Sequence, residues 1–411
     1  MTALLFTNAR IVDGTAPERG APMDVLVEAG RIREVAPKIT SAAAETVDLG
    51  GRTLMPGLID AHVHTIACLA DLGANAKLPD SLVTVRAMKL MGEMLMRGFT
   101  TVRDVGGADH GLKVAAAEGF FPAPRLNISG KALSQTGGHC DFRGPYDDRE
   151  TIKTGFALGA LGRVCDGVPE MRKAAREEIK GGAQFIKIMA NGGVASPTDP
   201  IHFLGFAREE LLAVVEEAEN AGTYVSAHLY TDAAIRRAVE CGVHSLEHCN
   251  LIQAETAKFA AAQGAIAVPT LVTYDKLSSE GAAMGFPANS VAKIDSVRLA
   301  GMESIAIMRE AGLPMAYGSD LLGQMHRHQS EEFVLRGQVM PAHEVIAAAT
   351  FIAARLLRME GQIGCIAPGA FADLVVVDGD PLADLALLTH QGRHMPIILQ
   401  GGAFVKRTAL N

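Results

Sequence analysis

The sequence predicts an α/β fold, a (β/α)8 barrel of the TIM type with a small β-sandwich domain formed by the N- and C-terminal segments. Three observations predict it. Strand-like apolar runs alternate with amphipathic helical stretches through the middle of the chain. Short strand-and-turn patterns fill both ends. Several of the middle runs finish on an ionisable residue, at the strand ends where barrels of this kind carry their chemistry.

The two ends of the chain share one pattern. Residues 1–55 hold short alternating runs such as "ALLFTNARIV" and "DVLVEAGRIREVAP", separated by glycine and proline, which is typical of strands and turns. Residues 363–411 repeat this pattern in "ADLVVVDGD" and "PIILQGGAFVKR". We therefore predict a discontinuous β-sandwich domain, residues 1–55 plus 363–411, with the barrel, residues 56–362, inserted between its two halves.

The middle of the chain supplies the barrel strands. The strand-like runs are "TLMPGLIDAHVH", "TTVRDVGG", "RLNISG", "QFIKIMANGG", "TYVSAHLY", "VHSLEHC", "AIAVPTLV" and "PMAYGSD". Helical stretches such as 208–222 and 303–312 lie between them, and both end on glycine, the usual helix stop. The alternative, an open doubly wound sheet, would need a glycine-rich phosphate turn after its first strand, where this chain has histidines.

Two segments, 131–170 and 275–300, are long and irregular for such a barrel. Long loops at the mouth of a barrel often act as lids or specificity elements. We therefore expect substrate choice to depend on these two segments.

Composition excludes several classes of protein. The chain has 411 residues, of which 48% are hydrophobic and 20% charged, as in ordinary globular proteins. A net charge of −8 and the lack of any Lys/Arg run argue against a nucleic-acid partner. No apolar run reaches the ~18 residues of a membrane span, and the N-terminus lacks a basic signal-peptide start, so we expect a cytoplasmic protein without a membrane partner. The six scattered cysteines predict free thiols.

Ionisable side chains end or occupy five of the predicted strands: His62 and His64 on the first, Lys187 on the fourth, His228 on the fifth, His248 on the sixth and Asp320 on the eighth. Taken singly, each has an ordinary interpretation as a core histidine, a helix cap or a strand-end lysine. Apolar strands that all finish this way at one barrel end make a poor core. Imidazole and carboxylate are zinc ligands, and histidines two apart on a strand share a face. The pattern therefore favours a metal site.

Lys187 is the unusual member of this set. A protonated amine repels cations, but burial lowers the pKa of a lysine and makes the neutral amine available. A neutral amine can capture CO2 as a carbamate, an anionic ligand with two oxygens that can bridge two metal ions. Such a bridge would explain a lysine among histidines.

These residues, in this order, resemble the amidohydrolase superfamily. The phrases "PGLIDAHVH", "EH" after the sixth strand, "GSD" and "GAFADLVVVDGDP" are similar to it as well, and the likeness covers nearly the whole chain. Lys187 lies where the binuclear members carry a carboxylated lysine. "GGH", "IKIMANGG" and "AHLY" resemble the Xaa-amino-acid carboxypeptidase and prolidase-like branch and the ochratoxin-hydrolysing amidases, with imidazolonepropionase a more distant relative.

The resemblance implies two divalent ions, with zinc expected and manganese or cobalt also suited to these ligands. It implies that His62, His64 and Asp320 hold one ion, that His228 and His248 hold the other, and that a carbamate on Lys187 bridges them. A metal-bridging hydroxide would then attack the scissile carbonyl, and Asp320 would carry its proton to the leaving amine.

The implied reaction is hydrolysis of the amide bond in N-acyl amino acids or before the C-terminal residue of small peptides. The alternative is a cyclic amide or lactone hydrolase of the imidazolonepropionase type. His139 and Tyr230 are candidate substrate-binding residues, with an ordinary loop histidine and a cavity-wall tyrosine as the alternatives. His326, and with it His328, could line the pocket or lie directly behind the residues that do. We expect a small-molecule substrate and a homo-oligomer.

Overall fold

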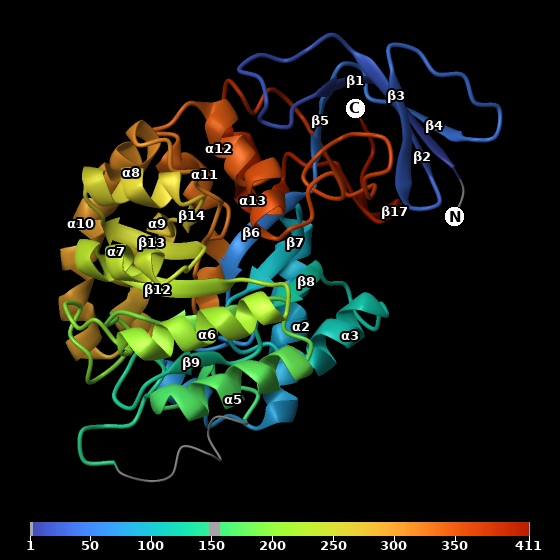
Figure 1. The fold of residues 1–411 in the computed structure, drawn as a ribbon. Helices are drawn as coiled ribbons and strands as arrows, with labels where there is room; N and C mark the ends of the chain where they lie inside the picture. Colours follow the sequence, from blue (N-terminus) through green and yellow to red (C-terminus); the bar gives the residue numbers. More distant parts are fainter. Residues whose placement is uncertain (1–2, 148–156, 411) are drawn as a thin grey trace.

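The computed structural model describes residues 3–147 and 157–410, which form a barrel with a smaller sheet at one side (Figure 1). The smaller sheet contains β1 (Leu4–Ile11), β2 (Met23–Glu28), β3 (Arg31–Ala36), β4 (Glu45–Asp48), β5 (Thr53–Pro56), β15 (Leu374–Val377), β16 (Ile397–Gln400) and β17 (Ala403–Arg407). Its order is β17-β16-β15-β5-β1-β2-β3, with β4 paired to β1. The two ends of the chain join where β5 pairs antiparallel with β15.

The barrel strands are β6 (Leu58–Val63), β7 (Phe99–Asp104), β8 (Arg125–Ile128), β9 (Ala132–Ser134), β10 (Gly162–Val164), β11 (Ile186–Met189), β12 (Val225–Thr231), β13 (Ser245–Leu251) and β14 (Ile266–Val268). They form two parallel arcs, β6-β7-β8 and β10-β9-β11-β12-β13-β14. The third predicted strand corresponds to β8, which pairs with β7, and an additional strand, β9, follows it and pairs with β11. Gly130, between them, has a φ of 68°, which favours glycine.

The eighth predicted strand is only an extended segment. Met315 forms an isolated parallel bridge with Ala267, and the Ala61 N–H donates to the Tyr317 carbonyl. These bonds close the barrel between β14 and β6. The α/β barrel with an added sheet, predicted from the sequence, is therefore confirmed.

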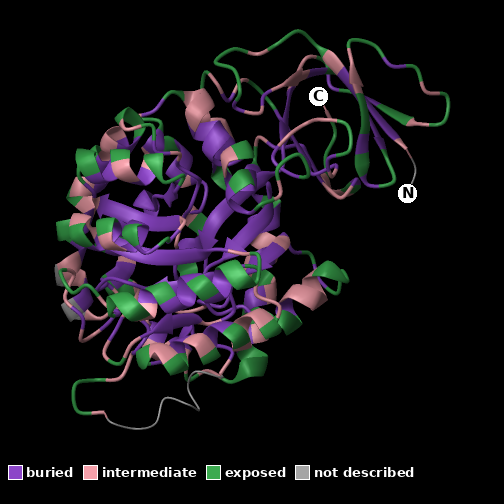
Figure 2. Cartoon of the chain, viewed as in Figure 1, coloured by how far each residue is buried: buried purple, intermediate pink, exposed green. Residues whose placement is uncertain are grey.

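Helices cover the outside of the barrel, and Figure 2 shows their exposed faces around the buried strands. They are α1 (Leu72–Asn75), α2 (Asp80–Met96), α3 (His110–Ala117), α5 (Gly167–Lys180), α6 (Arg208–Asn220), α7 (Asp232–Glu240), α8 (Ala254–Ala262), α9 (Leu271–Lys276), α10 (Ala288–Glu310), α11 (Glu331–Arg336), α12 (Ala342–Ala348) and α13 (Phe351–Leu356). Shorter turns of helix lie at Leu277–Gly281, Ala282–Met284, Gly323–His328, Leu385–Leu388 and His390–Gly392. Within the described ranges, no helix is long and apolar enough to cross a membrane.

The helix and thiol predictions compare well with the structure. The helical stretches predicted at 208–222 and 303–312 correspond to α6 and to the second half of α10, and Gly222 and Gly312 follow them with a φ of 69°. All six cysteines are free thiols, as expected.

The prediction that 275–300 is irregular is wrong from Ala288 onward, where α10 begins directly after Pro287, while short helical turns and a loop fill 277–287. The apolar residues of α10 do not gather on one face, so its sequence lacks the usual helical signal. The other segment, 131–170, contains β9, β10 and the start of α5, and its residues 148–156 lie outside the described part of the chain.

A buried ion pair fixes the loop that follows β14. Arg336 donates to Glu332 (2.7 Å), to the Pro269 carbonyl (2.6 Å) and to the Ala316 carbonyl (3.0 Å). Glu332 in turn accepts the Val272 N–H at 2.7 Å. Both side chains are fully buried. The pair thus ties the end of β14 to the extended eighth segment at the mouth of the barrel.

Replacing this cation should destabilise the whole fold. We expect Arg336→Met to lower the free energy of unfolding by about 3–5 kcal/mol, because it leaves Glu332 buried without its partner. The half-exposed pair of Arg309 and Glu344 provides the control, and Arg309→Met should cost less than about 1 kcal/mol. Denaturant unfolding measures both, and equal losses would contradict the role given to Arg336.

Candidate metal centre

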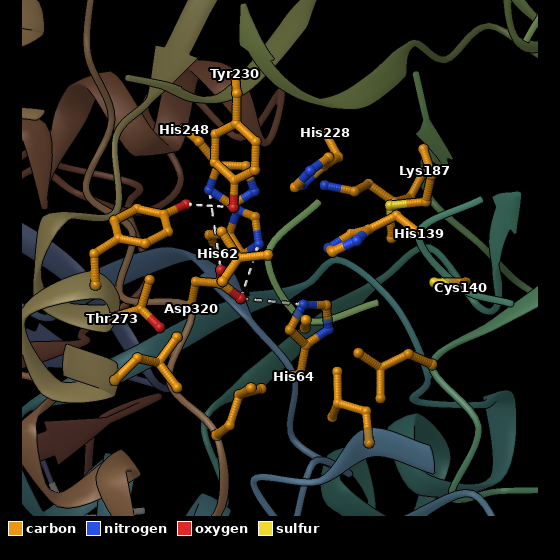
Figure 3. Close-up of a pocket in the computed structure, with 18 of the residues that line it drawn as sticks. His62, His64, His139, Cys140, Lys187, His228, Tyr230, His248, Thr273 and Asp320 are labelled. Atoms are coloured by element: carbon orange, nitrogen blue, oxygen red, sulfur yellow. Dashed lines mark hydrogen bonds and ion pairs between the residues drawn. The ribbon is translucent and has the colours of Figure 1, made fainter. Parts of the chain in front are cut away.

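The carboxyl ends of the barrel strands bring the predicted side chains to one cavity (Figure 3). It is lined by His62 and His64 of the first strand, Lys187 of β11, His228 of β12, His248 of β13 and Asp320 after the eighth segment. The space among these side chains, counted with its opening to solvent, is about 520 Å³. The six side chains predicted as ligands therefore do meet in space.

Asp320 lies at the centre of the cluster. Its Oδ1 is 3.4 Å from His62 Nε2 and 3.3 Å from His64 Nε2, and its Oδ2 is 3.9 Å from His248 Nδ1. One ligand atom from each of His62, His248 and Asp320 falls within 4.8 Å of the others, close enough to hold a metal ion. Burial works against the ionised form, but His62 holds the pKa of Asp320 well below its usual range, so the carboxylate is charged.

Two residues of the site have unusual backbone conformations. His248 has a φ of 72° and Asp320 a φ of 50°, in the left-handed region that residues other than glycine rarely adopt. Such strain persists only where the surrounding structure enforces it, and it concentrates at functional sites. The backbone here is therefore shaped to aim the two side chains into the cavity.

The protonation of Lys187 and of two histidines bears on whether the site fits metal ions. Only 1% of the residue is exposed, and in the described part of the chain no hydrogen bond or ion pair reaches its Nζ. Burial lowers the pKa of Lys187 to about 8. Burial likewise lowers the pKa of His228 and His248 well below the usual value, so both imidazoles are neutral, as metal ligands must be. This donor set fits divalent metal ions.

Behind the cluster lies a buried carboxylate that sequence reasoning missed. Glu247 Oε2 accepts a hydrogen bond from His62 Nδ1 (2.7 Å), and its Oε1 accepts one from Arg103 (2.7 Å). The hydroxyls of Ser226 and Ser245 donate to the same Oε1. Burial alone would raise the pKa of Glu247, but Arg103 and His62 hold it well below its usual range. The carboxylate therefore fixes His62 with Nδ1 protonated and leaves Nε2 for the cavity.

The other three histidines are oriented in the same way. His64 Nδ1 donates to the Gly106 carbonyl (2.9 Å), and His228 Nε2 donates to the Gly192 carbonyl (3.3 Å). His248 Nδ1 is 2.8 Å from Thr270 Oγ1. In each ring one nitrogen is thus engaged by the scaffold, and the other is left for a ligand.

The predicted substrate-binding residues fall into two groups. His139 and Tyr230 line the cavity, where His139 stacks on His228 at 4.1 Å between ring centroids. The Tyr230 hydroxyl bonds the hydroxyl of Tyr274, at 3.0 Å. Tyr274 is not among the predicted site residues, and it lies in α9, whose first two residues belong to the predicted seventh strand.

His326 and His328 do not line this cavity. His326 is buried behind it and donates from Nε2 to the Ala67 carbonyl at 3.2 Å. His328 bonds Glu331 and Glu280 in a separate surface groove. The structure gives neither residue a direct path to a molecule in the cavity.

Comparison with known proteins identifies the family of this chain. The family model described as the amidohydrolase family matches residues 53–402. The chain belongs to the amidohydrolase family. Ochratoxinase of Aspergillus niger is 30% identical over 375 residues, which cover 86% of this chain and 75% of that protein.

Solved structures agree with this family. A prolidase complexed with N-methylphosphonate-L-proline is 47% identical, covers 99% of this chain and 100% of its own, and superposes with a TM-score of 0.97. A Xaa-Pro dipeptidase with bound methionine is 28% identical, with coverages of 98% and 100% and a TM-score of 0.88. The resemblance predicted from the motifs is confirmed, and this amidohydrolase is a hydrolase of amide or peptide bonds. Amidohydrolases are generally metal-dependent, and the donor set of this cavity is compatible with metal ions.

Replacing the carboxylate behind His62 should weaken metal binding. We expect Glu247→Gln to lower affinity for divalent metal about 10- to 100-fold, because an amide no longer fixes His62 in the required tautomer. Chelator competition against the metal-loaded protein measures the affinity. Glu332→Gln is the matched control, since Glu332 is equally buried and paired with an arginine but contacts no predicted ligand. Equal affinities in the two variants would contradict the role of Glu247.

Proposed function

We propose that this amidohydrolase releases the C-terminal amino acid from N-acyl amino acids and dipeptides, using two divalent ions. One observation carries the proposal: the six donor side chains share a small cavity with His139 and Tyr230. Such a cavity brings the scissile amide, the ions and two hydrogen-bonding side chains within reach of one another. The relatives named ochratoxinase, prolidase and Xaa-Pro dipeptidase support the same reaction class.

The donor set divides between the two proposed ions. His62, His64 and Asp320 would hold one ion, His228 and His248 the other, with a carbamate on Lys187 between them. We propose zinc, which these ligand types favour. When bound, the two ions would supply a nucleophile from water at neutral pH and polarise the scissile carbonyl. Asp320 lies near ligand atoms on both sides of this division.

The side chains of the chain supply proton transfer and orientation. Asp320, kept ionised beside His62, can accept the proton of the attacking water and pass it to the leaving amine. Burial raises the pKa of Tyr230, so its phenol keeps a proton to donate to the carbonyl oxygen or the developing oxyanion. His139 lies beside His228 and can hydrogen-bond the substrate from the same side.

The apolar part of the cavity indicates the residue released. Its lining includes Leu72, Phe142, Leu161, Met189, Leu277 and Leu322. A charged side chain would lose its hydration there without gaining a partner. Together with the proline analogue bound to the prolidase, this favours proline or another apolar residue at the C-terminal position.

A substrate panel tests the function. N-acetyl derivatives of proline, phenylalanine, leucine and arginine would be incubated with the metal-loaded enzyme, and products identified by mass spectrometry. We expect free proline or another apolar amino acid, and much slower release of arginine. No amino acid released from any member would exclude this function and leave the cyclic amide or lactone alternative.

The bridging role of Lys187 has a matched control. We expect Lys187→Ala to lower the metal content below that of the wild type and to abolish turnover, since the carbamate would be lost. Lys131 is half-buried and its pKa is also lowered to about 8 by burial, but its amine donates to backbone carbonyls away from the cavity lining. Lys131→Met should keep the wild-type metal content. Elemental analysis measures the metal content of both variants. Full activity of Lys187→Ala would refute the proposed carbamate.

A further inference from the structure

We infer that the segment after β11, residues 191–200, is a positioning element for His139. Asp199 acts through Ser196 to orient the His139 ring, and Lys293 of α10 holds the segment in place. The three are positioning residues, since none of them lines the cavity. The inference rests on the proposed function, in which His139 contacts the substrate.

A chain of hydrogen bonds sets the tautomer of His139. Ser196 Oγ donates to the Asp199 carboxylate and lies 2.7 Å from His139 Nδ1. Because the hydroxyl has given its one proton to a carboxylate, it can only accept from the imidazole. Nδ1 therefore carries a proton, and Nε2 is left for contacts in the cavity. Ser196 and Asp199 are buried, so water does not compete for these bonds.

The backbone of the segment also fits closely against the ring. A Cβ atom placed on Gly193 would lie 1.7 Å from His139 Nδ1, so only glycine allows this approach. The Gly193 N–H donates to Asp199 Oδ2 at 3.1 Å. His228 stacks on the same ring with an interplanar angle of 23°. The ring is thus held between a predicted metal ligand and this segment.

Lys293 of α10 fixes the segment through its ammonium group. Its Nζ donates to the carbonyls of Gly193 (3.0 Å), Ser196 (2.9 Å) and Asp199 (3.2 Å). These three acceptors use all three N–H donors of the ammonium. Lys293 therefore serves the segment and is not available to bind a substrate carboxylate. A further bond, from Thr198 Oγ1 to the Gly137 carbonyl (3.2 Å), ties the segment to the loop of His139.

The geometry excludes a nucleophilic Ser–His–Asp triad. In such a triad the carboxylate bonds the imidazole, and the imidazole accepts the serine proton. Here the carboxylate bonds the serine, and Asp199 Oδ2 is 3.7 Å from His139 Nδ1, beyond hydrogen-bonding distance. Ser196 is also fully buried. The set can orient the histidine but cannot attack a substrate.

A double-mutant cycle tests the role of Asp199. We expect Asp199→Asn and Ser196→Ala each to lower kcat for N-acetyl-L-proline about tenfold or more, with KM nearly unchanged and the wild-type metal content. In a His139→Ala background, Asp199→Asn should have no further effect, because the residue it positions is gone. Multiplicative losses in the double variant, or unchanged kcat in both single variants, would overturn the inference.

Hydrogen–deuterium exchange tests the lysine without relying on turnover. In the metal-loaded protein, Lys293→Met should speed exchange across residues 191–200, including the Gly193 amide, while Lys293→Arg should restore part of the protection. Lys406→Met is the matched control, since Lys406 also donates to a backbone carbonyl, that of Gly392, in the terminal sheet. Unchanged exchange in Lys293→Met would overturn the clamp. A wild type that releases no amino acid would instead refute the proposed function and leave this exchange result interpretable.

Discussion

The candidate site depends on one buried ion pair, that between Arg103 and Glu247 beneath the cavity. Two charges with no exposed surface are stable only when each is fully paired and hydrogen-bonded. Arg103 meets this condition by also donating to the Ala61 carbonyl and to Ser245, and Glu247 by accepting from His62 and two serines. The orientation of a predicted metal ligand is thus fixed by the same bonds that make the buried charges tolerable. A substitution of either residue of the pair would therefore also change the orientation of His62 in the cavity.

The scaffold around the cavity also orients the other predicted metal ligands by hydrogen bonds. Each histidine of the cluster has one nitrogen engaged by a carbonyl, a hydroxyl or a carboxylate of the scaffold. Lys187 is the exception, because its amine has no partner within the described ranges. The scaffold therefore engages each of the four clustered histidines and leaves the amine of Lys187 without a hydrogen bond. A carbamate on Lys187 would turn this amine into a metal ligand. Metal binding and the state of Lys187 would then depend on each other.

Most of the barrel and the six clustered side chains could be predicted from the sequence. The reason is that ionisable residues in or after apolar runs form a local pattern along the chain. His62 and His64 follow an apolar run, Lys187 lies within another, and His228, His248 and Asp320 lie near the ends of later ones. Residues that act across the barrel have no such pattern. Arg103 and Glu247 look like strand residues, and Lys293 lies on α10, a helix without a clear apolar stripe. His326 was expected in the pocket from its nearness in sequence to Asp320, but its short helix turns it against Ala67.

The order in which the chain is made gives the pairing of β5 with β15 a further consequence. β5 is synthesised before its partner β15, and the whole barrel lies between them in the chain. Until then β5 has an open edge, and unpaired strand edges recruit other chains. β5 leads into β6 through Gly57, where a Cβ would lie 2.0 Å from Thr100 Oγ1, so the strand that carries His62 begins at this edge. Pairing with β15 therefore covers a strand edge directly before the strand that carries His62.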